Sequence, residues 1–240
     1  MTGVAVKADL FGEAAHLANS ETLSERAAAL VEHDILAGVW QPGDRLGIQA
    51  LSERYGVGAT PLREGLSRLV SRNLISAVGQ KGFRVASMSE ADLFDITQVR
   101  IMVEIEALRR SIRDGRDDWE ANVISSLHRL VRSVERDPET MREGTPEFDR
   151  LHKAFHRSLL EACGSERLLR LHDDLYYQAY RYRRTMMSRF SEHGSFVEAH
   201  RTLADAVLSR DATRAEAELA QHLRQTLNIV YGGATAGAKP

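Results

Sequence analysis

The run from Gln49 to Val85 constrains the fold of this chain more than any other segment. At its centre, the Thr60 hydroxyl can cap the first free amides of a helix, and Pro61 then stands at the first helical position, where its missing N–H costs nothing. Leucines follow at spacings of four and three along one apolar face: Leu62, Leu66 and Leu69. The segment therefore predicts a helix that begins at Thr60 and turns a polar, basic face to solvent.

The residues on either side of this helix predict a second helix before it and a β-ribbon after it. Residues 50–57 read as a helix that ends at a tight turn. Two short apolar segments, residues 74–78 and 83–85, enclose the glycine-containing stretch 79–82, which suits a two-stranded turn. The order helix, turn, helix and ribbon predicts a winged helix-turn-helix.

Positive charge is concentrated in this part of the chain. Residues 45–85 contain seven basic and two acidic side chains, a net charge of +5, whereas the whole chain carries −2 and the remainder therefore −7. This asymmetry is expected when one segment meets phosphate, although a solvated basic surface gives the same count. A capped, amphipathic and basic helix that follows a helix and a turn favours nucleic-acid binding.

Residues 22–86 resemble the DNA-binding domain of the GntR family of bacterial transcription regulators. Four stretches carry the resemblance: residues 35–38 with 42–46, residues 51–57, residues 60–64 and residues 82–85. Family members usually carry Ser-Arg before the Thr-Pro pair, where this chain has Gly58 and Ala59, so one expected DNA contact is absent. They also prefer Ala at the position of Gly65, and a Gly inside a helix costs about 1 kcal/mol relative to Ala.

The basic helix and the wing supply the expected DNA contacts. Arg63 is expected to make the strongest contact in the major groove. The other candidates position the helix and anchor the wing on base edges and phosphates: Gln49, Thr60, Ser67, Arg68, Lys81 and Arg84. A homodimer would place one such helix in each half of a palindromic double-stranded operator.

Composition sets the class of protein and its compartment. The chain has 240 residues, 43% of them apolar, and a single cysteine, Cys163, so no intramolecular disulfide can form. No apolar run approaches the roughly 18 residues needed to span a bilayer, and the start lacks the pattern of a signal peptide. We expect a cytoplasmic protein with four parts: a flexible arm (1–20), the winged helix-turn-helix (21–87), a helical effector and dimerisation domain (88–231) and a flexible tail (232–240).

Every long segment after Ser89 has helical periodicity, and no strand pattern competes with it. The expected helices cover residues 90–113, 118–136, 146–163, 166–188, 195–209 and 212–230. The fold class is therefore mainly α: an N-terminal winged helix-turn-helix with a small β-wing, followed by an all-α antiparallel bundle.

Four histidines fall on the apolar stripes of this bundle. His152 and His156 lie one turn apart on the third helix, and His200 and His222 lie on the fifth and sixth. On one unbroken helix the last two would be about 33 Å apart, but Asp211 can cap a new helix, so that the chain turns back and returns both rings to one level. Four inward imidazoles from three helices suit a metal site in a bundle core.

Other interpretations of the histidines remain open. A single inward histidine is usually a hydrogen-bonded core residue, and His152 need not coordinate a metal. The remaining histidines are not on clear apolar stripes, or lie in loops, and we expect them to be surface residues: His16, His33, His128, His172 and His193.

Residues 92–230 resemble the FCD-type effector domain of FadR-like GntR regulators, a helical bundle that often holds a divalent metal and binds small organic acids. The matching motifs are residues 99–100 with Glu104, residues 155–156, residues 199–200 and residues 210–211 running on to His222. Metal-binding members usually have Asp where this chain has His152. Four nitrogen ligands suit Zn, Ni, Co or Cu better than Mg or Ca, with Zn or Ni preferred here, and Asp149 is a candidate acceptor that would orient a ring.

Arg100 falls on the inward face of the first bundle helix, where a guanidinium requires an anion. The anion is either Glu104, one turn away, or the carboxylate of a small effector, and both can hold at once. Tyr177, Arg181 and Arg184 on the fourth helix have a spacing that suits either the same pocket or a solvated cationic face.

The sequence therefore predicts a ligand-responsive transcription regulator, more specifically a repressor, and not an enzyme or a membrane protein. Two alternatives remain: a metal-free regulator that binds an apolar acid or acyl thioester, and a metal-dependent enzyme built in the bundle. No convincing general base accompanies the histidines, which argues against the enzyme.

Overall fold

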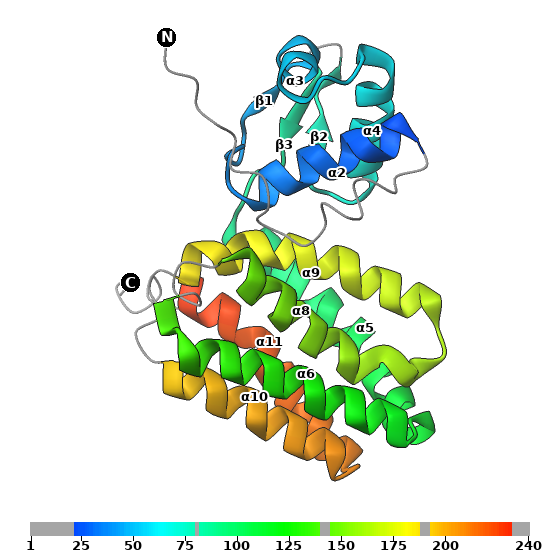
Figure 1. The fold of residues 1–240 in the computed structure, drawn as a ribbon, viewed down its shortest axis with the longest axis vertical. Helices are drawn as coiled ribbons and strands as arrows, with labels where there is room; N and C mark the ends of the chain where they lie inside the picture. Colours follow the sequence, from blue (N-terminus) through cyan, green and yellow to red (C-terminus); the bar gives the residue numbers. More distant parts are fainter. Residues whose placement is uncertain (1–21, 80–81, 140–144, 188–192, 232–240) are drawn as a thin grey trace, which may run out of the picture. The chain divides into compact units, whose positions relative to one another are not determined.

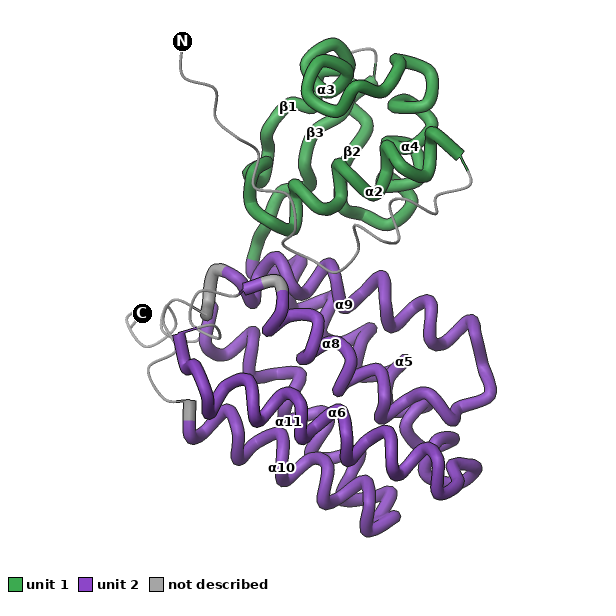
Figure 2. The backbone as a smooth tube through the Cα atoms, viewed as in Figure 1, with its two compact units in different colours: residues 1–89 green, residues 90–240 purple. Residues whose placement is uncertain are grey.

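The computed structural model describes residues 22–79, 82–139, 145–187 and 193–231, and the chain divides into two compact units, residues 1–89 and 90–240 (Figure 2). Four features expected from the sequence lie outside the described residues: the arm at 1–20, the tail at 232–240, Lys81 and His16. Within the described residues, no helix is both long and apolar enough to cross a membrane.

The first unit is a winged helix-turn-helix, as the sequence predicts (Figure 1). Its elements follow in the order α2 (Leu23–Leu36), β1 (Arg45–Leu46), α3 (Ile48–Tyr55), α4 (Ala59–Ser71), β2 (Ile75–Ala77) and β3 (Phe83–Val85). The strands form one antiparallel sheet in the order β1-β3-β2, so the wing has a short third strand that the sequence did not indicate. The three leucines of α4 are buried and pack into the core of this unit.

The start of α4 differs from the prediction. Gly58 is the N-cap residue, with its carbonyl accepting from the Leu62 amide at 3.2 Å, and the helix begins at Ala59. Thr60 and Pro61 therefore occupy the second and third helical positions, and no side chain of the N-cap residue is available to cap the helix. Proline is tolerated there because none of the first-turn amides has a partner within the helix.

Gly65 lies where α4 crosses α2. A Cβ atom at this position would lie 2.7 Å from the Ser24 carbonyl oxygen and 2.8 Å from the Ala28 amide nitrogen. Both are backbone atoms, so α2 cannot yield by rotating a side chain. The glycine that seemed unfavourable from helix propensity is therefore required by the close approach of the two helices.

Gly65→Ala is expected to lower the stability of the DNA-binding unit, by about 1–3 kcal/mol for an overpacked core, even though alanine is the better helix former. Thermal unfolding followed by circular dichroism measures the effect. Gly194→Ala is the matched control, because a Cβ there meets nothing within 4 Å and should leave the unfolding temperature unchanged or higher. A higher unfolding temperature for Gly65→Ala would show that the helices do not approach as closely as described.

The second unit is the predicted helical bundle. Its helices are α5 (Glu90–Asp114), α6 (Asp117–Arg136), α8 (Pro146–Leu160), α9 (Glu166–Met187), α10 (His193–Leu208) and α11 (Ala212–Tyr231), with a short 3-10 helix at Glu161–Cys163 after α8. In the core, α5 packs against α9 and α11, while α6 packs against α8 and α10 (Figure 1). Each helix agrees with its sequence prediction to within a few residues.

The turn between α10 and α11 returns the chain along the bundle. Arg210 adopts a left-handed conformation, with φ of 56°, and its guanidinium donates to the carbonyls of Ile112 and Gly115 at 2.7 and 2.8 Å. The next residue, Asp211, accepts from the Arg214 amide at 3.0 Å and caps α11, as predicted. Because α10 and α11 pack side by side, residues 22 apart in sequence come to the same level of the bundle.

Candidate metal centre and nucleic-acid interface

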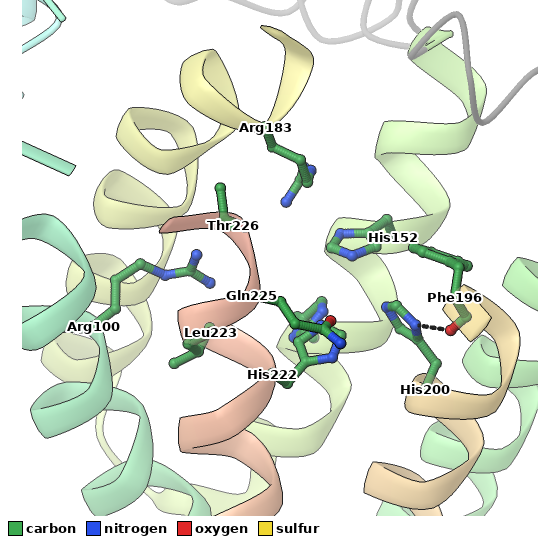
Figure 3. Close-up of a pocket in the computed structure, with 10 residues that line it drawn as sticks. Arg100, His152, Arg183, Phe196, His200, His222, Leu223, Gln225 and Thr226 are labelled. Atoms are coloured by element: carbon green, nitrogen blue, oxygen red, sulfur yellow. Dashed lines mark hydrogen bonds between the residues drawn. The ribbon is translucent and has the colours of Figure 1, made fainter. Parts of the chain in front are cut away.

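The bundle brings all four predicted histidines together. His152 and His156 come from α8, His200 from α10 and His222 from α11, and one ring nitrogen from each lies within 4.8 Å of the corresponding nitrogens of the other three. Figure 3 shows the rings of His152, His200 and His222 turned toward one another. The turn at Arg210 therefore brings His200 and His222 to the same level of the bundle, as predicted.

Hydrogen bonds orient two of the four rings. His200 Nδ1 donates to the Phe196 carbonyl at 2.7 Å, which leaves the Nε2 lone pair free, and His152 Nδ1 lies 2.8 Å from the Tyr176 hydroxyl. Several buried ring nitrogens have no partner among the described residues: both of His156, Nε2 of His200 and Nδ1 of His222. Buried polar atoms without partners are unfavourable and rare, so the cluster is a candidate site for a metal ion.

Burial keeps these imidazoles neutral. Loss of water lowers the pKa of His152, His156 and His222 well below the usual value, and the positive charge of neighbouring rings and of arginines adds to the effect. The pKa of His200 falls to about 4 through burial, despite its hydrogen bond to the Phe196 carbonyl. Neutral rings present the lone pairs that metal ions require.

The geometry fits a divalent transition metal. Four nitrogens bound at about 2.0–2.1 Å to a tetrahedral Zn ion stand about 3.4 Å apart. The four nitrogens here lie within 4.8 Å of one another, so each would move inward by up to about 0.9 Å to share one ion. Four nitrogens and no carboxylate favour Zn, Ni, Co or Cu over Mg or Ca.

A small cavity of about 40 Å³ adjoins the histidines. Besides the four rings it is lined by Arg100, Arg183, Phe196, Leu223, Gln225 and Thr226 (Figure 3). One water-sized group occupies about 10–15 Å³, so the cavity has room for about three such groups. Its polar rim and size suit the head group of a small acid and not an acyl chain.

Arg100 is paired within the protein. Its Nε donates to Glu104 Oε1 at 2.8 Å, and both side chains are buried. The same Glu104 oxygen lies 3.1 Å from Nδ1 of His172. Burial opposes the ionised form of Glu104, but the charge of Arg100 and the contacts with Arg100 and His172 outweigh it and lower the pKa of Glu104 to about 2. Thus the internal pair exists, and Arg100 still reaches the cavity wall.

The prediction that His172 is a surface residue was wrong, since its side chain is fully buried. It lies on the inward face of α9, and that face also carries Tyr176 and Arg183. Neither of these two residues was predicted from the sequence to lie at the site. Residues 169, 172, 176, 179, 180 and 183 follow helical spacing and are all buried, so the periodicity was present in the sequence. Because several of these residues are charged or polar, the pattern does not read as a buried apolar face.

Arg183 takes the place expected for other residues of α9. It lines the cavity, whereas Tyr177, Arg181 and Arg184 do not. Its Nη2 donates to the Tyr176 hydroxyl at 2.7 Å and to Asp149 Oδ1 at 3.3 Å.

Asp149 also departs from its expected role of orienting a histidine. It faces Arg183, while Tyr176 contacts His152. Burial raises the pKa of Asp149 to about 6, against the opposing charge of Arg183.

The predicted DNA-binding residues lie on the exposed surface of the first unit. Thr60, Arg63, Ser67 and Arg68 are exposed on α4, Gln49 is exposed in the first turn of α3, and Arg84 is exposed on β3. Four of them have partners within the protein: Gln49 donates to Glu53 at 3.2 Å, Ser67 to the Arg63 carbonyl at 2.8 Å, Arg68 to Glu25 at 3.2 Å and Arg84 to the Gly43 carbonyl at 2.8 Å. Arg63 lines a groove of about 350 Å³ between α4 and the wing.

A winged helix-turn-helix joined to a helical bundle defines a DNA-binding transcription regulator. Residues 23–85 match the bacterial regulatory proteins of the gntR family, and residues 95–225 match the FCD domain. The chain belongs to the GntR family, in the FadR-like subfamily with an FCD domain, and it is a regulator and not an enzyme.

Curated relatives and a solved structure agree with this assignment. The chain is 38% identical over 205 residues to the HTH-type transcriptional repressor GlaR of Escherichia coli, covering 83% of this chain and 92% of the relative. It is also 38% identical over 217 residues to the HTH-type transcriptional regulator BphR of Paraburkholderia xenovorans, covering 89% and 87%. The structure of Escherichia coli McbR/YncC shares the fold with a TM-score of 0.74 at 21% identity, covering 89% of this chain and 99% of that one.

Proposed function

We propose that this regulator is a repressor that binds a palindromic operator as a homodimer and responds to a small carboxylate through a metal in its bundle. The observation that carries the proposal is the cluster of four histidines, three of which have unpartnered buried nitrogens, beside two arginines, in a chain that also has an exposed recognition helix. The name of GlaR, a repressor 38% identical to this chain, supports the direction of control.

On the DNA side, Arg63 is the residue proposed to read bases in the major groove. Its guanidinium is exposed on α4, and a guanidinium can donate two hydrogen bonds to one guanine. The other predicted contacts serve to position the recognition helix and the wing: Gln49, Thr60, Ser67, Arg68, Lys81 and Arg84. The Arg68–Glu25 ion pair is exposed and therefore weak, so it does not prevent Arg68 from contacting phosphate.

Arg63→Ala is expected to weaken operator binding at least tenfold, because one bidentate base contact is worth about 1–3 kcal/mol and each dimer loses two. Fluorescence anisotropy with promoter fragments from the neighbourhood of the gene measures the affinity. Glu64→Ala, an exposed neighbour on α4, is the control and should bind as tightly as the wild type or more tightly. If the wild-type protein binds none of these fragments at low salt, the proposed function is wrong.

On the effector side, the four histidines would hold Zn or Ni, and such a cation supplies a Lewis-acidic site for a carboxylate oxygen. Because the ligands are neutral, they leave the full charge of the ion in the cavity, which favours an anion. Arg100 and Arg183, which approach from α5 and α9, would orient that anion by charge-assisted hydrogen bonds (Figure 3).

The small cavity volume supports one of the effector classes left open by the sequence. About 40 Å³ of polar-rimmed space accepts a short organic acid, whereas an acyl thioester needs a long apolar channel. We therefore favour the small carboxylate over the apolar ligand.

A further inference from the structure

The basic side chains of the DNA-binding unit fall into two groups according to their partners. Three arginines are paired with carboxylates of α2: Arg54 with Asp34 at 2.7 Å, Arg68 with Glu25 at 3.2 Å and Arg72 with Glu32 at 2.6 Å. The guanidinium groups of Arg45 and Arg63, by contrast, form no hydrogen bond or ion pair with any residue that the structure describes, and both side chains are exposed. The net charge of +5 in this segment therefore overstates the charge available to DNA.

Arg45 and Arg63 line the same groove. Arg45 comes from β1 and Arg63 from α4, and the groove between them is completed by wing residues that include Gly79, Gly82 and Phe83. At about 350 Å³ it is nearly ten times as large as the bundle cavity. Two unpartnered guanidinium groups in an open groove attract a negatively charged, extended ligand.

The sheet register places a further positive charge near Arg45. Arg45 and Arg84 are directly opposite each other on β1 and β3, and both are exposed. Directly opposed side chains lie on one face of the sheet, and like charges in that arrangement are destabilising unless an anion lies near them. An anionic group of the bound ligand would remove the repulsion between Arg45 and Arg84.

We propose that Arg45 contacts a backbone phosphate of the operator DNA in the groove between α4 and the wing. The inference rests on the proposed function, and it adds a DNA contact on β1, outside the recognition helix. A phosphate contact is assigned to Arg45, rather than base reading, because Arg45 lies in the wall of the groove on β1 and not on the helix that would enter the major groove. Between Gly58 and Leu62 the start of α4 has no basic side chain, so Arg45 also supplies charge that this turn lacks.

The test is the salt dependence of binding to two duplexes, one selected by the wild-type protein from a random pool and one with the same bases scrambled. Each phosphate contact contributes about 0.9 to the slope of log affinity against log salt, so Arg45→Ala should reduce the slope by about 2 per dimer. Its affinity should fall by a similar factor, about tenfold, on both duplexes. Arg45→Lys should keep most of the slope, because a phosphate contact needs charge more than fork geometry.

Two arginine variants act as controls. Arg72→Ala, which removes a paired arginine, should leave the slope unchanged. Arg63→Ala should weaken binding to the selected duplex much more than binding to the scrambled one. Circular dichroism confirms that each variant is folded, and Arg45→Gln replaces Arg45→Ala if the latter is not.

Three results would overturn the assignment of Arg45. The first is a wild-type slope for Arg45→Ala, or Arg45→Gln, when Arg63→Ala is weakened. The second is a loss confined to the selected duplex, which would show base reading. The third is an Arg45→Lys variant as weak as Arg45→Ala. Failure of the wild type to select any duplex would instead contradict the proposed function.

Discussion

Replacing His200 or His222 with alanine is expected to abolish stoichiometric binding of Zn or Ni and the stabilisation that comes with it. A ligand that binds only the folded state at 1,000 times its dissociation constant stabilises that state by about 4 kcal/mol. For a chain of this size, such a gain corresponds to a rise of roughly 8–16 °C in the unfolding temperature. Elemental analysis of the purified protein and calorimetry with and without a chelator measure the two effects.

The matched control for this prediction is His128→Ala, because His128 is an exposed histidine of α6 in the same bundle. This variant should retain one equivalent of metal and the full rise in unfolding temperature. His152→Ala tests whether the histidine at the usual aspartate position coordinates the metal. This variant should bind the metal more weakly if all four rings coordinate. A full equivalent of metal in both His200→Ala and His222→Ala would show that the cluster is not the binding site.

The metal-free protein is expected to lose stability steeply as the pH falls from about 6.5 to 5. The pKa values of the four clustered histidines are lowered in the folded state, so these rings stay neutral while the unfolded chain takes up protons below its ordinary histidine pKa. Their contribution is therefore fully present above pH 6.5 and is lost on acidification. For His200, whose pKa is about 4, the loss reaches about 3 kcal/mol.

Two buried carboxyl groups modify this pH profile. Asp149 has a pKa raised to about 6, so the folded state gains stability from its protonation as the pH falls through 6, which offsets about one of the four histidine protons. Glu104 has a pKa lowered to about 2, so its ionised form stabilises the fold until the pH falls below about 4.5. The four histidines thus outnumber the one carboxyl group that opposes them, so unfolding takes up protons near pH 5.2 and the stability falls on acidification.

Chemical denaturation in the presence of a chelator, repeated at several pH values, measures this slope directly. His200→Asn should reduce the slope by about one proton, whereas His128→Asn should not change it. Saturating Zn should shift the loss of stability to lower pH, since protons then compete with the metal for the ring nitrogens. A free energy of unfolding that is flat between pH 6.5 and 5 would show that the rings are not held neutral in the fold.

The four-histidine set has a consequence for ligand selection. Arg100 is balanced by Glu104 and Arg183 faces Asp149, so the two guanidinium groups add little net charge to the cavity. A divalent cation held by neutral imidazoles would keep its charge of +2 there. Under the proposed function, His152 in place of a carboxylate would therefore strengthen the attraction of the site for an anion.

The amino-acid sequence by itself determined the architecture and the four clustered histidines. Hydrophobic period identifies the buried face of each helix, and a capping residue such as Asp211 marks where a helix begins, because both are local properties. The one-turn spacing of His152 and His156, and the return of the chain between His200 and His222, follow from the same local rules.

Only the tertiary structure decided which side chains meet across elements. Helix propensity disfavoured Gly65, but the backbone of α2 leaves no space for a Cβ atom. The charge count treated the arginines of the first unit alike, but carboxylates of α2 pair with three of them, while Arg45 and Arg63 have no such partner among the described residues. His172 and Arg183 were buried by packing of α9. The physical reason is that periodicity fixes the face of a helix, whereas its partner depends on contacts between residues distant in sequence.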